Sequence, residues 1–151
     1  MAALGAGWAI LSVVAGGMIA IQAPLNAQLA RALGSPIAAA AVSFIAGTLA
    51  LIVMTAVLLT ASGPALTWRG APPWLFVTGG CLGAFFVTCS IILTPKLGAA
   101  AFLGFAVTGQ LVAGLLLDHY GLFDLAVREV SLGRLAGAVL LIVGAVLLRI
   151  A

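Results

Sequence analysis

Charged residues are scarce in this sequence. Only 6% of its 151 residues are Asp, Glu, Lys or Arg, whereas 65% are hydrophobic. A soluble domain carries charge at about a quarter of its positions. The scarcity of charge and a mean hydropathy of +1.37 exclude an ordinary soluble domain and indicate an integral membrane protein. The six basic residues are scattered singly, so the sequence offers no nucleic-acid-binding patch.

Residues that bind metals or perform catalysis are equally scarce. The chain has one histidine and two cysteines. Cys81 and Cys89 are separated by about 12 Å along a helix, which is too far for a disulfide. Together with His119 they form no metal-binding pattern, and no nucleophile stands beside a general base at a recognisable spacing. We therefore expect no metal, no cofactor and no enzymatic activity.

Apolar residues form five long spans. They cover residues 4–29, 36–61, 73–93, 99–117 and 132–148. Each span has about 17 to 26 residues, enough to cross a hydrocarbon core of about 30 Å. The sequence therefore predicts an all-α integral membrane protein in which residues 1–151 form one membrane domain with five transmembrane helices. We expect the first span to be retained, with cleavage near Ala23 or Ala27 as the alternative.

Prolines and a small polar residue mark the ends of several spans. Ser35 is expected to cap a helix that begins at Pro36, because serine accepts backbone hydrogen bonds there and proline fits the first helical position. Pro24 is expected to kink or break the first helix, and Pro95 to end the third, because proline lacks an amide hydrogen.

The basic side chains show no bias that would orient the spans. An odd number of spans puts the termini on opposite membrane faces. The basic residues then divide three and three, with Arg69, Arg128 and Arg134 on one face and Arg31, Lys96 and Arg149 on the other. Basic loops normally decide orientation, so this chain is expected to insert both ways and form an antiparallel dimer with the architecture of an inverted repeat. A single orientation with weak bias is the alternative.

The middles of the spans hold amides and hydroxyls but no Asp, Glu, Lys or Arg. Gln22 and Asn26 are four residues apart on one helical face beside Pro24, and Trp8 extends that face. An uncharged polar stripe beside a proline is typical of a helix that lines a substrate path. We expect Gln22, Asn26 and Trp8 to bind substrate, with Gln110 and Ser43 adding to the lining. The alternative role for the amides is hydrogen bonding between helices.

Two further patterns indicate structural contacts. Gly133, Gly137 and Gly144 give the last span a face of small residues suited to a partner helix in the same subunit or the next. Asp118 follows the fourth span, where the helix dipole disfavours an unpaired anion, and Arg134 begins the fifth span on the same membrane face. We therefore predict an Asp118–Arg134 ion pair.

Several of these residues resemble one membrane protein family in their order along the chain. The similar segments are Gln22–Asn26, Gly79–Phe86, Pro95–Gly98, Gly109–Gln110, and Asp118–Gly121 followed by Arg134. They resemble the YdcZ family, also called DUF606, which is placed in the drug/metabolite transporter superfamily. The resemblance implies a bacterial inner-membrane protein of five-helix units that occur as single chains, paired homologues or fused copies.

The same resemblance implies a distant link to the small multidrug resistance proteins, which are antiparallel dimers. Their first helix bears a membrane-embedded glutamate that binds cationic substrates and protons. This chain has no matching acid, so proton-driven export of cations does not carry over. The expected partners are a small-molecule substrate, membrane lipid and a second copy of the chain or a paired homologue.

The combined expectation is a transporter that carries a small polar or zwitterionic metabolite by alternating access across an antiparallel homodimer. A small dual-topology channel for ions or solutes is the alternative, because it would also use an uncharged polar path. A third hypothesis is a membrane subunit that only assembles with a partner protein. Purification of a stable dimer without any other protein would argue against this third hypothesis.

Added charge should reveal whether both orientations are needed. Two or three lysines placed around Arg69 should hold that loop on the cytoplasmic face, since basic loops are retained there. Reporters fused to the C-terminus would then detect one orientation, and transport activity should fall. Activity should return when a copy with the opposite bias is supplied. Full activity of the biased variant alone would contradict the predicted antiparallel dimer.

Overall fold

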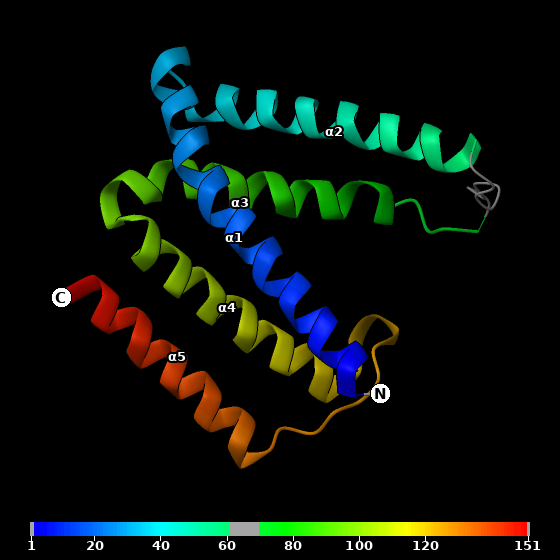
Figure 1. Cartoon of the computed structure of the whole chain (residues 1–151), viewed down its shortest axis with the longest axis vertical. Coiled ribbons are helices and arrows are strands. Elements are labelled where there is room, and N and C mark those ends of the chain that lie inside the picture. Colours follow the sequence, from blue (N-terminus) through cyan, green and yellow to red (C-terminus); the bar gives the residue numbers. More distant parts are fainter. Residues whose placement is uncertain (1, 61–69, 151) are drawn as a thin grey trace. The chain divides into compact units, whose positions relative to one another are not determined.

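The computed structural model describes residues 2–60 and 70–150, with side chains from residue 7 onward. Its elements in chain order are α1 (Ala2–Leu33), α2 (Pro36–Thr60), α3 (Leu75–Leu97), α4 (Ala99–Tyr120), the short 3-10 helix η1 (Leu122–Asp124) and α5 (Leu132–Ile150) (Figure 1). All five α-helices are long and apolar enough to cross a membrane, which confirms the predicted number of spans. Arg69 and the predicted end of the second span at residue 61 lie outside the described residues.

The helices begin and end where local chemistry requires, with one departure from expectation. Ser35 caps α2: its hydroxyl accepts from the Ala38 amide at 3.3 Å, and its carbonyl accepts from the Ala39 amide at 3.1 Å. The prediction that Pro95 ends the third helix is wrong, because α3 continues to Leu97. Pro95 has no amide hydrogen, so the carbonyl of Ile91, four residues earlier, loses its helical donor. The hydrogen bonds after Pro95 are still possible: the Gly98 amide donates to the Thr94 carbonyl at 2.9 Å.

Pro24 likewise lies inside a helix. The first helix is continuous from Ala2 to Leu33, so Pro24 does not break it. Because proline has no amide hydrogen, the carbonyl of Ala20 loses its usual helical donor. Gly34 then ends α1 with a φ of 70°, a left-handed conformation that glycine adopts without steric cost.

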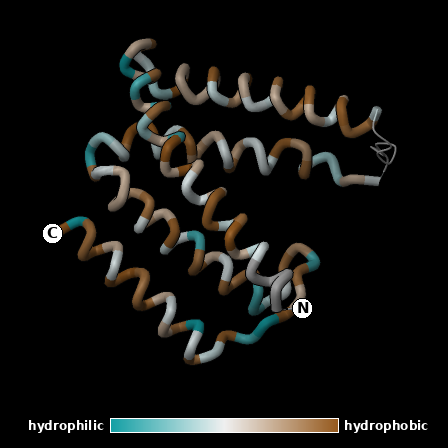
Figure 2. The backbone as a smooth tube through the Cα atoms, in the orientation of Figure 1, coloured by the Kyte–Doolittle hydropathy of each residue, from teal (hydrophilic) through white to brown (hydrophobic). Residues whose placement is uncertain are grey.

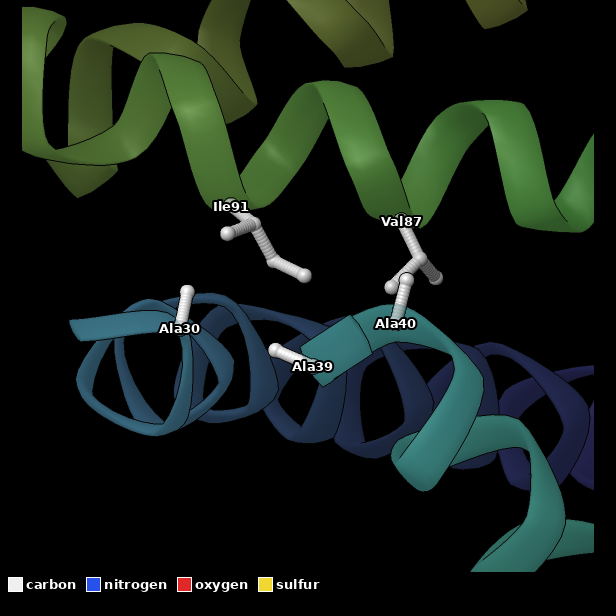
Figure 3. Packing of buried hydrophobic residues seen from close by; sticks show 5 residues of the cluster. All are labelled: Ala30, Ala39, Ala40, Val87 and Ile91. Carbon is white, nitrogen blue, oxygen red and sulfur yellow. The ribbon is translucent and has the colours of Figure 1, made fainter. Parts of the chain in front are cut away.

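The described residues group into two compact units. One unit comprises Ile21–Ile92, and the other comprises the residues up to Ala20 and from Leu93 onward. In the first of these, side chains from α1, α2 and α3 form a small apolar cluster of Ala30, Ala39, Ala40, Val87 and Ile91. Figure 3 shows the three alanines facing Val87 and Ile91 of α3. Small side chains on α1 and α2 thus let α3 approach them closely.

The second unit is built on the antiparallel pair of α4 and α5. Ala138 and Ala145 of α5 are buried, with exposed fractions of 7% and 2%. A Cβ added at Gly104 of α4 would lie 3.0 Å from the Ala145 Cβ, so these small residues set the closest approach of the two helices.

Most side chains of the five helices lie on the surface of the chain. Buried residues make up between 0% and 17% of the most apolar window of each helix, and no large side chain in the described residues is fully buried. Figure 2 shows brown, hydrophobic backbone along the helices and teal, hydrophilic backbone gathered mainly near their ends. This surface is suited to contact with lipid or with another transmembrane helix.

The approach of α4 to α5 can be tested at Gly104. A Gly104→Ala substitution should lower the free energy of unfolding by about 1–3 kcal/mol, because the new methyl group meets Ala145. Gly109→Ala on the same helix is the matched control, since a Cβ there meets no atom within 4 Å. Thermal unfolding in detergent measures both variants. Equal stability of the two would contradict the close α4–α5 contact.

Candidate functional site

A cavity of about 230 Å³ lies among α1, α2 and α3, and we call it the α1–α2–α3 cavity. Its lining residues are Gln22, Ser43, Phe44, Gly47, Thr48, Leu51 and Val87. Two of the residues expected to bind substrate, Gln22 and Ser43, therefore meet in one cavity. The remaining lining is mainly apolar, as is common in small-molecule sites where a few polar groups orient the ligand.

The hydroxyl of Ser43 is available to a ligand. Serine and threonine hydroxyls in transmembrane helices often bond back to their own helix. Five others in this chain do so: Ser12, Thr60, Thr78, Ser90 and Thr108. Ser43 is half-buried, and its hydroxyl forms no hydrogen bond with any described residue.

The aromatic wall of this cavity depends on a glycine. Phe44 lines the cavity, and a Cβ added at Gly83 of α3 would lie 3.2 Å from the Phe44 ring. Gly83 therefore gives the ring space against α3. At Gly79, one turn earlier, an added Cβ meets no atom within 4 Å, so this second glycine makes no comparable approach.

Asn26 lies one turn after Gln22 on α1 and is 7% exposed. Its Nδ2 atom is buried and has no hydrogen-bond partner among the described residues. An unpaired amide costs about 1–3 kcal/mol when buried, and this Nδ2 atom can donate to a ligand without first losing a protein partner. Asn26 does not itself line the cavity, whereas Gln22, which does, is exposed.

A second cavity of about 440 Å³ lies between α4 and α5, and we call it the α4–α5 cavity. Its lining residues are Gln110, Leu111, Gly114, Leu115, Asp118, Arg134, Gly137 and Leu141. Gln110, expected to join the substrate site, thus lies in a different cavity from Gln22. On α4 the polar residues Gln110 and Asp118 are two turns apart on one face, with Gly114 between them.

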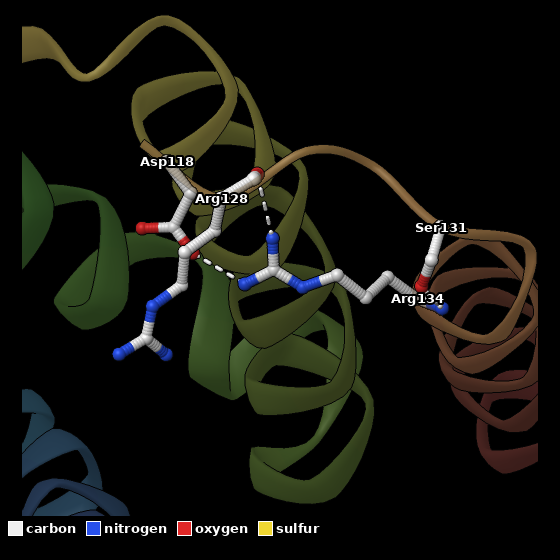
Figure 4. Close-up of polar contacts among 4 residues, drawn as sticks. All are labelled: Asp118, Arg128, Ser131 and Arg134. Carbon is white, nitrogen blue, oxygen red and sulfur yellow. Dashed lines mark hydrogen bonds and ion pairs between the residues drawn. The ribbon is translucent and has the colours of Figure 1, made fainter. Parts of the chain in front are cut away.

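The predicted ion pair is present at one end of this cavity. Arg134 Nη2 donates to Asp118 Oδ2, and both side chains are 30% exposed (Figure 4). Arg134 Nη1 also donates to the Arg128 carbonyl at 3.1 Å, and the Arg128 amide donates to the Asp118 carbonyl at 2.8 Å. Arg134 therefore holds the connecting segment against the end of α4.

This connection has a glycine that other residues cannot replace easily. Gly121 follows α4 with a φ of 60°, and its amide donates to the Leu117 carbonyl. A Cβ there would lie 2.7 Å from Val127 Cγ2. The left-handed cap and the close approach of Val127 let the chain fold back toward Asp118.

The other predicted positions lie outside both cavities, except Gly137. Trp8 is 67% exposed and belongs to the unit of α4 and α5 rather than to that of Gln22. An added Cβ meets no atom within 4 Å at Gly137 or Gly144, and at Gly133 it meets only the Ser131 hydroxyl at 3.9 Å. These glycines therefore make no close contact with α4, and Gly137 faces α4 across the α4–α5 cavity.

Thr48 is a lining residue that the sequence analysis did not single out. The spacing of Ser43, Gly47 and Leu51 follows one helical face, and Thr48 adjoins it. That spacing was the available signal, although α2 contains many apolar residues that obscure it. In the described part of the chain, no three His, Cys, Asp or Glu side chains gather to hold a metal ion.

The chain is similar in sequence to known membrane proteins. Residues 7–147 match a family described as "Putative inner membrane exporter, YdcZ". A segment of 72 residues is 39% identical to the inner membrane protein YdcZ of Escherichia coli strain K12. This segment covers 48% of the chain and 48% of that protein, so the similarity extends over about half the length of the relative. No solved structure matches the chain.

The Asp118–Arg134 pair should contribute to stability. Asp118→Asn or Arg134→Gln should lower the free energy of unfolding by about 1 kcal/mol, the usual scale for a partly exposed pair. The double variant with Asp118→Arg and Arg134→Asp should recover stability. It keeps one charge of each sign and places the cation at the C-terminus of α4 and the anion at the N-terminus of α5, where the helix dipoles favour them. Thermal unfolding measures these variants.

Glu129→Gln is the matched control for this test. Glu129 is exposed in the same connection, and its carboxylate pairs with no described residue. The control should unfold at the temperature of the unaltered protein. The ion pair would have no stabilising role if the single Asp118 and Arg134 variants behaved like the control.

Proposed function

The chain belongs to the YdcZ family of the drug/metabolite transporter superfamily and is a multi-pass inner-membrane protein; from this premise we propose that it carries a small polar or zwitterionic metabolite by alternating access as an antiparallel homodimer. The family is one of transporters rather than enzymes. The nature of the substrate and the arrangement of the subunits are the proposal.

The observation that carries the proposal is the convergence of polar groups around the α1–α2–α3 cavity. Gln22 and Ser43 line it, and the unpaired amide of Asn26 lies one turn away on α1. These groups can donate and accept hydrogen bonds but carry no charge. They favour a substrate that is polar without a large net charge.

The size of this cavity favours a site that two subunits share. Its volume of about 230 Å³ is below the roughly 300–1,000 Å³ typical of small-molecule sites. A second copy would add the same residues from the opposite side and enlarge the cavity. Ser43 belongs to that lining, whereas the substrate contacts of Trp8 and Gln110 stay predictions.

Three features support an antiparallel arrangement of the copies. The basic residues divide evenly between the two faces, so neither orientation is favoured. On α5, Gly133 and Gly144 have space for a partner helix, whereas Gly137 lines the α4–α5 cavity. A dimer of opposed five-helix units also reproduces the inverted repeat that many transporters encode in one chain.

Binding measurements should locate the substrate site. A thermal-shift screen of the purified dimer against polar and zwitterionic metabolites would provide a ligand. Gln22→Ala and Asn26→Ala should then weaken its binding about ten-fold each, the effect of losing about one hydrogen bond. Gln28→Ala is the control, because Gln28 is an exposed glutamine of the same helix that does not line the cavity.

Transport by the same variants separates a carrier from a channel. In liposomes, substrate inside the vesicle should stimulate uptake by exchange, and Gln22→Ala should reduce that stimulation. Normal binding by both the Gln22 and Asn26 variants would refute this site. Flux far above carrier rates, without exchange, would instead favour the channel.

A further inference from the structure

The charged end of the α4–α5 cavity lies where two membrane-spanning helices meet the interface. Asp118 is in the last turn of α4, which ends at Tyr120, and Arg134 is in the first turn of α5, which begins at Leu132. Both helices are long enough to span the hydrocarbon core. The ends of such helices lie at the level of the lipid headgroups.

The ion pair leaves hydrogen-bonding capacity on both residues. Asp118 uses only Oδ2 in the pair, so Oδ1 accepts no hydrogen bond from a described residue. Arg134 uses Nη1 and Nη2, which leaves Nε without an acceptor in the same part of the chain. One anionic and one cationic group therefore line this end of the cavity, each with an unused hydrogen-bonding atom.

Beyond the ion pair, leucines and glycines line most of the cavity, and Gln110 is the one further polar residue among the described residues of the lining. Leu111, Leu115 and Leu141 provide the apolar walls. Gly114 of α4 and Gly137 of α5 also line the cavity, and a Cβ added at either position meets no atom within 4 Å. Larger side chains at these two positions would occupy the space. The cavity begins at the ion pair and runs along the helices toward the membrane interior.

From this combination we infer that the α4–α5 cavity binds a zwitterionic phospholipid whose headgroup carries a primary ammonium, as in phosphoethanolamine. The ammonium donates hydrogen bonds to Asp118, and the phosphate accepts from Arg134. One acyl chain follows the leucines past Gly114. The inference concerns a structural lipid and does not depend on the proposed transport function.

The charges favour this headgroup over the other common ones. A choline headgroup has the same net charge but no N–H group for Asp118 to accept from. A glycerol headgroup is anionic and has no cation to place beside the carboxylate, so Asp118 repels it. The predicted order of affinity is therefore phosphoethanolamine, then phosphocholine and phosphoglycerol lipids of identical acyl chains.

Native mass spectrometry of the purified, delipidated protein tests this order directly. Titration with the three lipids should give about ten-fold tighter binding of the phosphoethanolamine lipid, equivalent to one or two charge-assisted hydrogen bonds. Equal binding of the phosphoglycerol lipid would overturn the inference, as would equal binding of all three.

Two variants connect the binding to the cavity. Gly114→Leu fills the cavity and should weaken binding of the phosphoethanolamine lipid about ten-fold or more. Gly109→Leu makes the same change on α4 outside the cavity, where an added Cβ meets no atom within 4 Å, and should leave binding unchanged. Unchanged binding by Gly114→Leu would overturn the proposal.

Asp118→Ala provides a test that does not depend on the folding of the Gly114 variant. Loss of both carboxylate oxygens should remove the preference for the ammonium headgroup over choline, because no acceptor for the N–H groups remains, while binding of the shared phosphate persists. A preference that survives in Asp118→Ala would overturn the assigned role of Asp118.

Discussion

Every backbone amide and carbonyl in the hydrocarbon must find its partner within the protein, and the rest of this structure depends on that constraint. It explains why the membrane-crossing segments are helices, whose backbone groups pair internally. Pro24 and Pro95 each remove one donor, at the carbonyls of Ala20 and Ile91. The two compact units divide after Ala20 and after Ile92, at or directly beside these two carbonyls.

Lipid surroundings also determine how these helices associate. Lipid tails are as apolar as leucine, so burying large apolar side chains between helices gives little advantage over leaving them in lipid. The contacts accordingly use small residues, such as Gly104 against Ala145 and Ala39 near Ile91. The described chain leaves space beside Gly133 and Gly144 on α5 and leaves the side chain of Gln22 on α1 exposed. These are the groups that our proposal places against a second copy and a substrate.

Features set by local sequence were predictable, whereas those set by tertiary contacts were not. Hydropathy alone predicted five spans, serine chemistry predicted the Ser35 cap, and the dipoles of two neighbouring helices predicted the Asp118–Arg134 pair. The prediction that Pro95 ends the helix was wrong, because the hydrogen bond that proline cannot form belongs to the preceding turn of α3 and the helix continues to Leu97. Helical periodicity does not specify which helices pack together. It therefore could not predict that Gln110 and Gln22 line different cavities, or that Gly104 lies against Ala145.

The central claim is that one short sequence builds both halves of an inverted pair. Labelling of a single cysteine tests it most directly. Ala71 is exposed in the connection before α3, so Ala71→Cys can be introduced after Cys81 and Cys89 are replaced by alanine. A membrane-impermeant maleimide should then label about half of the protein from each membrane face, as an antiparallel dimer of identical chains requires. Labelling from one face alone would contradict the account.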